Sequence, residues 1–400
     1  MHATGLRCAD CGWRGPLELT YACPECGGSL DVTYDYRAVD GAAVAAAVKA
    51  HRSVWSFREL LPVTGAEHIV TMDEGGTPLR QSRVIGPVLG VSLYFKDETR
   101  NPTLAFKDRP NTVGISVARE MGYDAIAIAS TGNGAASLSA YAARCGMTCN
   151  VFIPVSTPSG KLVQALYHGA NVIRVPGDYS ASFRAAYERC GREGWANLTS
   201  TYVNPYTMEG DKTIGYEIFG ALREATPDWI VVPLGAGPML SGIYKGFEEL
   251  QLLGLCDKLP RMLGVQAEGC APIIDAFLRG DDVVRPWLHT ETVADAIADP
   301  LTGYERDGGR TARAMRRSGG YGVKLSDDKI LEYVRRLARQ EGIFAEPASA
   351  ASVAAVADAL EQGVIRPGES VVSIVTAHGL KAAEELLKLS RAEAETGVQA

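Results

Sequence analysis

The chain has 400 residues, of which 46% are hydrophobic and 22% charged, values typical of an ordered globular protein rather than a disordered one. A net charge of -7, with no basic cluster interleaved with aromatics, argues against nucleic-acid binding. The longest apolar runs, such as residues 229–234, fall far short of the roughly 20 residues that cross a bilayer. Because the first residues lack the apolar core of a secretion signal, we expect a cytoplasmic protein without membrane contact.

Four of the nine cysteines cluster near the start of the chain as two Cys-x2-Cys pairs. The pairs are Cys8 with Cys11 and Cys23 with Cys26, and glycines follow each pair closely. Four thiolates at this spacing can bind one tetrahedral zinc ion, so we expect a zinc-ribbon-like segment over residues 1–36 with a structural zinc. The alternative is a degenerate ribbon that holds free thiols, because the 11-residue spacer is short.

Beyond the ribbon, short apolar runs alternate with amphipathic stretches. Strands that are apolar on both faces and alternate with helices indicate a parallel sheet covered on both sides. The predicted class is α/β, with two doubly wound, mostly parallel sheet domains. We expect a large domain from residues 37–93 and 206–390 and a small α/β domain from residues 94–205. The expected strands are residues 92–95, 125–129, 149–153, 171–175, 230–232, 262–265 and 370–375, and the expected helices include residues 42–50, 134–145, 161–167 and 330–340.

The residue that carries the most chemical information is Lys107, which follows the apolar triplet 104–106 and precedes Asp108. A lysine packed among apolar neighbours loses part of its preference for the charged form, and a neutral amine attacks carbonyls to form a Schiff base. The alternative is a lysine that extends to solvent and pairs with Asp108, in which case it has no chemical role.

Three polar turns follow predicted strands, and ligands of open parallel sheets bind at the carboxyl ends of strands. The turns are residues 130–134 (Ser-Thr-Gly-Asn-Gly), 235–237 (Gly-Ala-Gly) and 376–379 (Thr-Ala-His-Gly). The second turn leads into a helix, where free backbone N–H groups favour a phosphate. With Asn133 as an amide donor and Thr376 as a hydroxyl, these turns and Lys107 provide what pyridoxal phosphate requires.

The chain resembles the fold type II pyridoxal phosphate enzymes, and most closely the threonine synthase family of bacteria and archaea. The resemblance rests on residues 74–79 (EGGTPL), 101–103 (NPT), 106–109 (FKDR), 130–133 (STGN), 160–165 (GKLVQA), 204–205 (NP), 209–213 (EGDKT), 261–266 (RMLGVQ), 342–351 (GIFAEPASAA) and 378–381 (HGLK). These segments follow in order through nearly the whole chain.

The resemblance implies that Lys107 forms the Schiff base with the coenzyme. It also implies that Asn133 contacts the coenzyme's phenolic oxygen and that Thr376 faces its pyridine nitrogen. The remaining coenzyme contacts are Phe106 and, in the phosphate loop, Gly235, Ala236, Gly237 and Met239. The expected substrate contacts are Thr77, Ser130, Thr131, Lys161 and Lys212, of which the two lysines would hold a leaving phosphate unless they are solvated surface residues. Relatives of this kind are usually homodimers, which we expect here.

The chain departs from the family pattern around the substrate. Leu104, Ala105 and Pro110 replace residues that are usually glycine, serine and glycine. Tyr202 and Thr207 replace the usual serine and arginine that hold the substrate phosphate, so a bidentate cation is lost. The phosphate loop reads Gly-Ala-Gly-Pro-Met, and its proline offers no N–H. The coenzyme site is thus retained while the substrate pocket has diverged.

We therefore expect a pyridoxal-phosphate-dependent elimination or replacement on an activated amino acid. The first candidate is conversion of O-phosphohomoserine and water to threonine and phosphate. The alternatives are β-replacement on O-phosphoserine by an enzyme similar to cysteate synthase, or a diverged lyase of specialised metabolism. The last alternative is a ligand-sensing or scaffolding protein that binds a partner through its ribbon. The retained Lys107 argues against this alternative.

Overall fold

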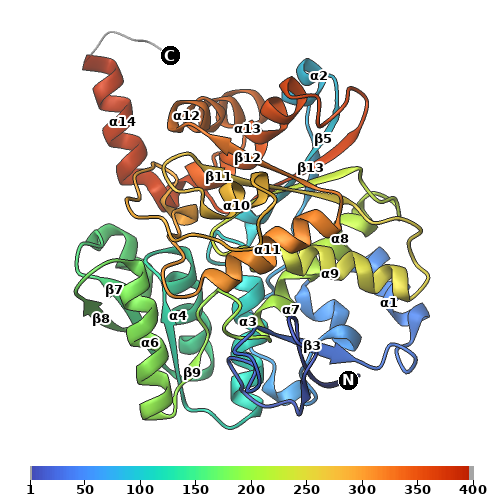
Figure 1. Ribbon diagram of the computed structural model, residues 1–400, viewed down its shortest axis with the longest axis vertical. Helices are drawn as coiled ribbons and strands as arrows, with labels where there is room; N and C mark the ends of the chain where they lie inside the picture. Colours follow the sequence, from blue (N-terminus) through green and yellow to red (C-terminus); the bar gives the residue numbers. More distant parts are fainter. Residues whose placement is uncertain (1, 396–400) are drawn as a thin grey trace.

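The computed structural model describes residues 2–395, and three sheets organise this part of the chain (Figure 1). The ribbon sheet has the order β2-β1-β3 and is antiparallel; its strands are β1 (Ala3–Cys8), β2 (Arg14–Gly15) and β3 (Leu30–Tyr34). The six-stranded sheet runs β12 (Tyr321–Leu325), β11 (Arg261–Ala267), β10 (Trp229–Pro233), β13 (Ser370–Val375), β5 (Ser92–Asp97) and β4 (Leu79–Gln81). The four-stranded sheet runs β8 (Asn171–Val175), β7 (Thr148–Pro154), β6 (Ala125–Ala129) and β9 (Ala196–Asn197). All pairs in the two larger sheets are parallel except β4 with β5, so the predicted α/β class is confirmed.

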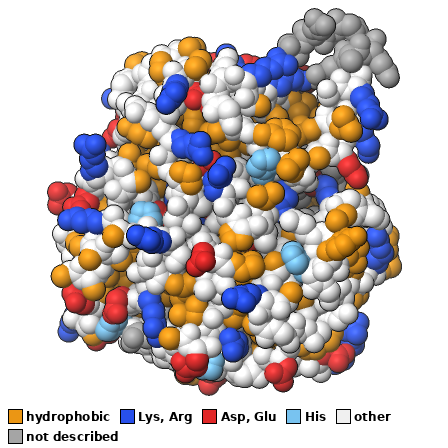
Figure 2. Space-filling view, turned by 180° about the vertical axis from the view of Figure 1, so that it is seen from behind, with side chains coloured by type: hydrophobic (Ala, Val, Ile, Leu, Met, Phe, Trp, Pro, Cys, Tyr) orange, Lys and Arg blue, Asp and Glu red, His pale blue; other side chains and the backbone are white. Residues whose placement is uncertain are grey.

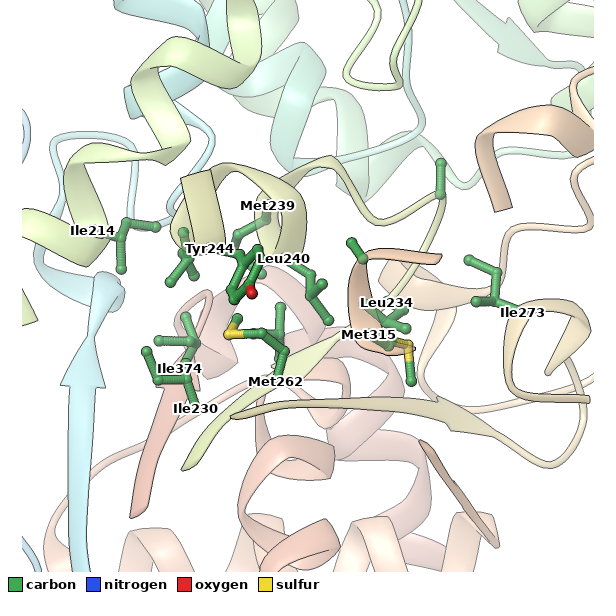
Figure 3. Packing of buried hydrophobic residues seen from close by; sticks show 14 of the residues in the cluster. Ile214, Ile230, Leu234, Met239, Leu240, Tyr244, Met262, Ile273, Met315 and Ile374 are labelled. Carbon is green, nitrogen blue, oxygen red and sulfur yellow. The ribbon is translucent and has the colours of Figure 1, made fainter. Parts of the chain in front are cut away.

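Helices cover both faces of the six-stranded sheet. One face packs against α2 (Ile85–Leu89), α12 (Asp327–Arg336) and α13 (Pro347–Glu361). The other packs against α8 (Thr213–Ala221), α9 (Pro238–Leu252), α10 (Pro272–Leu278) and α11 (Glu305–Arg317), with α1 (Gly41–Ala50) beside α8. Figure 3 shows Ile230 and Ile374 of the strands pointing toward Leu240 and Tyr244 of α9. Because successive side chains of a strand enter opposite cores, these strands are apolar throughout, as the sequence indicated.

The four-stranded sheet is also covered on both faces. One face packs against α3 (Asp108–Glu120), α4 (Asn133–Cys145) and α5 (Val163–Tyr167). The other face packs against α6 (Tyr179–Glu193). The expected boundary between residues 93 and 94 falls inside β5, which pairs along its length with β13. The chain thus leaves the six-stranded sheet only after Asp97. The division into two domains remains a prediction, and its first boundary belongs after residue 97 rather than after residue 93.

The N-terminal ribbon packs on the body of the protein through Leu6, Leu30 and Val32, which share a core with Val113 and Val117 of α3. The remaining helical segments are η1 (Val54–Leu60), η2 (Ala66–His68), η3 (Glu98–Arg100), η4 (Ser159–Leu162), α7 (Thr207–Asp211), η5 (Asp295–Ile297), η6 (Leu337–Glu341), η7 (Gly379–Ala382) and α14 (Ala383–Glu395). In residues 2–395 no helix is both long and apolar enough to cross a membrane. Figure 2 shows basic and acidic side chains interspersed over one face.

Candidate functional site

A cleft lies where the carboxyl ends of β6, β10 and β13 meet, the place that the three polar turns predicted. Eleven residues expected at the site line this single cleft: Phe106, Lys107, Ser130, Thr131, Asn133, Lys161, Gly235, Ala236, Gly237, Met239 and Thr376. They come from both larger sheets. The fold thus brings together residues as distant in the sequence as Phe106 and Thr376.

The lysine loop is fastened to the end of β13. Phe106 N donates to Thr376 O at 2.8 Å, and His378 N donates to Leu104 O at 3.0 Å. Below the loop, the buried Asp108 carboxylate accepts hydrogen bonds from Thr103 N at 2.7 Å and from the Thr103 and Ser137 hydroxyls, each at 2.6 Å. Leu104 holds a left-handed backbone at φ 65°, which costs on the order of 1 kcal/mol for a residue with a Cβ. The loop is therefore rigid, and it fixes the position of Lys107 at the start of α3.

The Lys107 amine is available for chemistry. Among the described residues its Nζ makes no hydrogen bond; it lies 4.5 Å from the centroid of the Phe106 ring. Burial lowers the pKa of Lys107, and the nearby carboxylates of Asp211, Asp299 and Glu346 oppose this shift without reversing it. Since the neutral amine is the nucleophilic form, this environment favours attack on a carbonyl.

The turn after β10 presents backbone donors to the cleft. No hydrogen bond from the N–H groups of Gly235, Ala236 or Gly237 is found among the described residues. These donors precede α9, a helix of 15 residues whose first turn also has free N–H groups. Ser200, whose buried hydroxyl oxygen has no partner in residues 2–395, lies in the same cleft. Unpaired donors at a helix N-terminus fit a phosphate group.

The side chains of Thr376 and Asn133, which line the cleft with Lys107, are held by hydrogen bonds from neighbouring residues. Thr376 Oγ1 lies 2.7 Å from Ser349 Oγ, whose oxygen also accepts from Ala377 N at 2.8 Å. Asn133 Nδ2 donates to both carboxylate oxygens of Glu346 at 3.1 Å. The amide and hydroxyl are therefore oriented before any ligand binds. Together with the free amine and the phosphate loop, they fit pyridoxal phosphate.

Glu346 was not expected as a site residue, although it lies in the 342–351 segment that carried part of the resemblance. Burial raises the pKa of Glu346 to about 7, while the hydrogen bonds from Asn133 act in the opposite direction. The folded protein thus keeps a proton that the unfolded chain releases near pH 4.3. The stabilisation by this proton is complete below that pH and is lost as the pH rises through 7.

Replacing Glu346 with glutamine should remove this pH dependence. Between pH 5 and pH 8 we expect the unfolding free energy of the coenzyme-free wild type to fall by about 3 kcal/mol relative to Glu346→Gln. Urea unfolding at the two pH values measures the difference. Glu361→Gln, at an exposed position, is the control and should show the wild-type trend. Parallel pH profiles for wild type and Glu346→Gln would contradict the assignment.

The structure does not bring two of the expected substrate residues, Thr77 and Lys212, to the cleft. Thr77 is buried, donates to Glu98 Oε1 at 2.6 Å, and accepts from Arg109 Nη2 at 3.0 Å. Lys212 is fully buried, where its Nζ pairs with Glu209 at 2.6 Å and Glu249 at 3.0 Å. Both side chains hold the core of the protein together, and neither lines the cleft.

Other residues line the cleft without having been expected there: Tyr179, Ser200, Asp295, Asp299, Glu346 and Lys381. Asp299 accepts a hydrogen bond from Tyr304, and burial raises the pKa of its carboxyl to about 6. Lys381 donates to Gln164, and Lys161 pairs with Asp295 across the cleft. Lys381 lies in the 378–381 segment that carried part of the resemblance, which was the signal that could have marked it.

The four N-terminal cysteines converge, with all four Sγ atoms within 4.8 Å of one another. Cys8 Sγ lies 3.5 Å from Cys26 Sγ, and Cys11 Sγ lies 3.6 Å from Cys23 Sγ. Burial raises the pKa of Cys8, but N–H donors from Cys11 and Asp10 more than offset this and lower it to about 7. Four sulfur atoms at this spacing, with N–H groups that favour the thiolate, fit a tetrahedral metal.

Comparison with known proteins agrees with this geometry. The family model described as "Pyridoxal-phosphate dependent enzyme" matches residues 70–377. The chain is 40% identical over 388 residues to threonine synthase of Methanocaldococcus jannaschii, covering 96% of this chain and 94% of that one. It is 41% identical over 379 residues to threonine synthase of Methanosarcina acetivorans, covering 94% and 92%.

Among solved structures, maize serine racemase superimposes with a TM-score of 0.67 at 20% identity, covering 80% of this chain and 93% of that one. At that identity the likeness concerns the fold alone. The two sequence comparisons decide the relationship, because they span nearly the whole length of both proteins. The chain belongs to the pyridoxal-phosphate-dependent enzymes and, within them, to the family of the threonine synthases.

Proposed function

We propose that this enzyme converts O-phosphohomoserine and water into threonine and inorganic phosphate, breaking a carbon–oxygen bond of the substrate. The observation that carries the proposal is the Lys107 amine, free of hydrogen bonds among residues 2–395, in a cleft that the backbone N–H groups of the 235–237 turn also line. Threonine synthases at 40% identity over almost the whole chain support the choice of reaction. We further propose a cytoplasmic homodimer, as the sequence indicated.

Lys107, Asn133, Thr376 and the loop of Gly235, Ala236, Gly237 and Met239 would hold pyridoxal phosphate, with Phe106 beside the lysine. Bound coenzyme supplies an aldehyde that accepts an amine and a ring that withdraws electrons from the substrate α-carbon. Thr376 would hold the coenzyme's ring nitrogen with a hydroxyl rather than a carboxylate, which would suit elimination more than transamination. The Lys107 amine takes the proton from the α-carbon and returns it later in the reaction.

The substrate phosphate needs cations, and the usual positions do not provide them. Tyr202 and Thr207 are buried and lie outside the cleft. The lysines that line it, besides Lys107, are Lys161 and Lys381. We propose that these two hold the substrate phosphate, while Ser130 and Thr131 contact the rest of the amino acid.

The lysine assignment predicts a defect in binding. Lys381→Met should raise KM for the phosphorylated substrate about 10- to 100-fold, because a charge-assisted contact is removed. It should weaken competitive inhibition by inorganic phosphate by a similar factor. Steady-state kinetics with a phosphate titration measures both. Lys258→Met, whose side chain is 58% exposed, serves as the control; an unchanged inhibition constant in Lys381→Met would rule out the contact.

The loss of the usual serine and arginine keeps a competing function open, β-replacement on O-phosphoserine. Incubation of the purified holoenzyme with each phosphorylated amino acid, followed by phosphate and product analysis, separates the two. Threonine and equimolar phosphate from O-phosphohomoserine support our proposal. Phosphate released from O-phosphoserine alone would favour the replacement enzyme instead.

A further inference from the structure

Helix α11 lies between the N-terminal ribbon and the six-stranded sheet (Figure 1). Three arginines spaced four and three residues apart reach the ribbon from one side of this helix. Arg306 donates to Cys26 O, Arg310 to Ser29 Oγ at 2.8 Å and to Asp31, and Arg313 to Asp10 Oδ1 at 2.5 Å. Asp10 stands between Cys8 and Cys11, and Cys26 belongs to the four-cysteine cluster. The helix therefore binds the two turns that carry the thiols.

The other side of α11 holds the phosphate loop from behind. Thr311 Oγ1 donates to Ala236 O at 2.6 Å. Tyr202 OH donates to Gly237 O at 3.1 Å and lies 2.9 Å from Thr311 Oγ1. Gly237 has φ 97°, and a Cβ at this residue would come within 2.3 Å of Thr311 Oγ1. The conformation of the loop thus depends on close contact with α11 and Tyr202.

Arg310 joins the two sets of contacts. Its guanidinium carbon lies 4.3 Å from the centroid of the Tyr202 ring, while its nitrogens hold Ser29 and Asp31. Arg310 is only 9% exposed, so solvent screens these contacts little. Ala9 N, next to Cys8, donates to Ser29 O at 3.0 Å. A path of hydrogen bonds and stacking therefore runs from the Cys8 turn through Ser29, Arg310 and Tyr202 to Gly237.

We propose that Arg310, Tyr202 and Thr311 are positioning residues that couple metal binding at the four cysteines to coenzyme binding at the phosphate loop. A metal held by four thiolates fixes the turns that contain Asp10 and Cys26, and these fix the arginines of α11. Loss of the metal releases the turns, loosens α11 and disorders the donors of the loop. The inference concerns coenzyme affinity and does not depend on which substrate the enzyme takes.

The first test compares coenzyme affinity with and without metal. Coenzyme-free protein is prepared with zinc bound and after chelation, with zinc content measured by mass spectrometry, and each form is titrated with pyridoxal phosphate by its visible absorbance. We expect chelation to weaken the apparent Kd about tenfold, equal to one or two lost hydrogen bonds, and restored Zn²⁺ to reverse the change. An unchanged Kd after demonstrated zinc loss overturns the proposal.

The second test examines the path itself. Tyr202→Phe keeps the ring over Arg310 but removes the hydroxyl; it should bind coenzyme about tenfold more weakly with full zinc content. Because the path is then cut, chelation should change its Kd much less than in the wild type. Tyr206→Phe is the matched control, since its buried hydroxyl donates to Glu18 O and does not touch the loop. If Tyr202→Phe fails to fold by circular dichroism, Arg310→Lys replaces it. Equal chelation effects in variant and wild type overturn the coupling.

Discussion

Replacing Lys107 with alanine is expected to abolish the reaction, lowering kcat by at least about 10³-fold. The cleft contains other amines, but Lys161 pairs with Asp295 and Lys381 donates to Gln164. Of these three, Lys107 is the one whose Nζ is free of hydrogen bonds among residues 2–395, and burial lowers its pKa. Phosphate release measures the rate, and the visible absorbance of bound coenzyme reports the bond to the lysine. Both signals should disappear together.

Two further variants separate the roles that a lysine can have here. Lys107→Arg keeps the positive charge but remains protonated, so it should be as inactive as Lys107→Ala. Lys388→Ala removes an exposed lysine of α14 and should keep full activity. Substantial turnover by Lys107→Arg would mean that the residue acts only through its charge. The assignment of Lys107 as nucleophile and base would then be wrong.

The sequence predicted strands with continuous apolar runs well, and it also placed edge strand β8 at its observed bounds. Strands β6, β10 and β13 are apolar on both faces because helices cover both, and such runs are easy to recognise. Edge strand β12 was not expected, because Lys324 points to solvent and breaks the run. Helix α11 was missed as well, since its arginines suggest a solvated surface. Their partners, such as Asp10 and Asp31, lie about 300 residues earlier in the chain.

The sequence predicted those site residues that lie in polar turns directly after strands. The turns at residues 235–237 and 376 meet because β10 and β13 are neighbouring parallel strands of the six-stranded sheet. The turn at residues 130–134 follows β6 of the four-stranded sheet, whose carboxyl end faces the same cleft. Thr77 and Lys212 were expected at the site, but both lie in the core outside the cleft. Each lies in a motif shared with the family. The motif does not show that Thr77 binds Glu98 and Lys212 binds Glu249 in the core. Burial is decided by partners distant in sequence, which a local pattern cannot show.

Replacing Arg109, which is fully buried, is expected to lower the stability of the protein strongly. Its guanidinium donates to Glu98 at 2.7 and 2.9 Å and to both carboxylate oxygens of Glu217 at 2.7 Å. Lys96 pairs with Glu217 at 2.6 Å, so the cluster contains two cations and two anions. Burial alone would raise the pKa of Glu217, but these ion pairs hold it well below its usual range. Arg109→Met should lower the unfolding free energy by about 3–5 kcal/mol, measured by urea unfolding.

The size of this effect comes from the charge left behind, and that can be tested separately. Arg109→Met leaves Glu98, Glu217 and Lys96, a buried cluster with one uncompensated negative charge. Adding Glu98→Gln restores neutrality, so the double variant should be more stable than Arg109→Met alone, although it carries two substitutions. Arg192→Ala, at a side chain 72% exposed, should change stability by less than about 1 kcal/mol. If the double variant were the less stable of the two, lost packing and hydrogen bonds rather than unpaired charge would account for the role of Arg109.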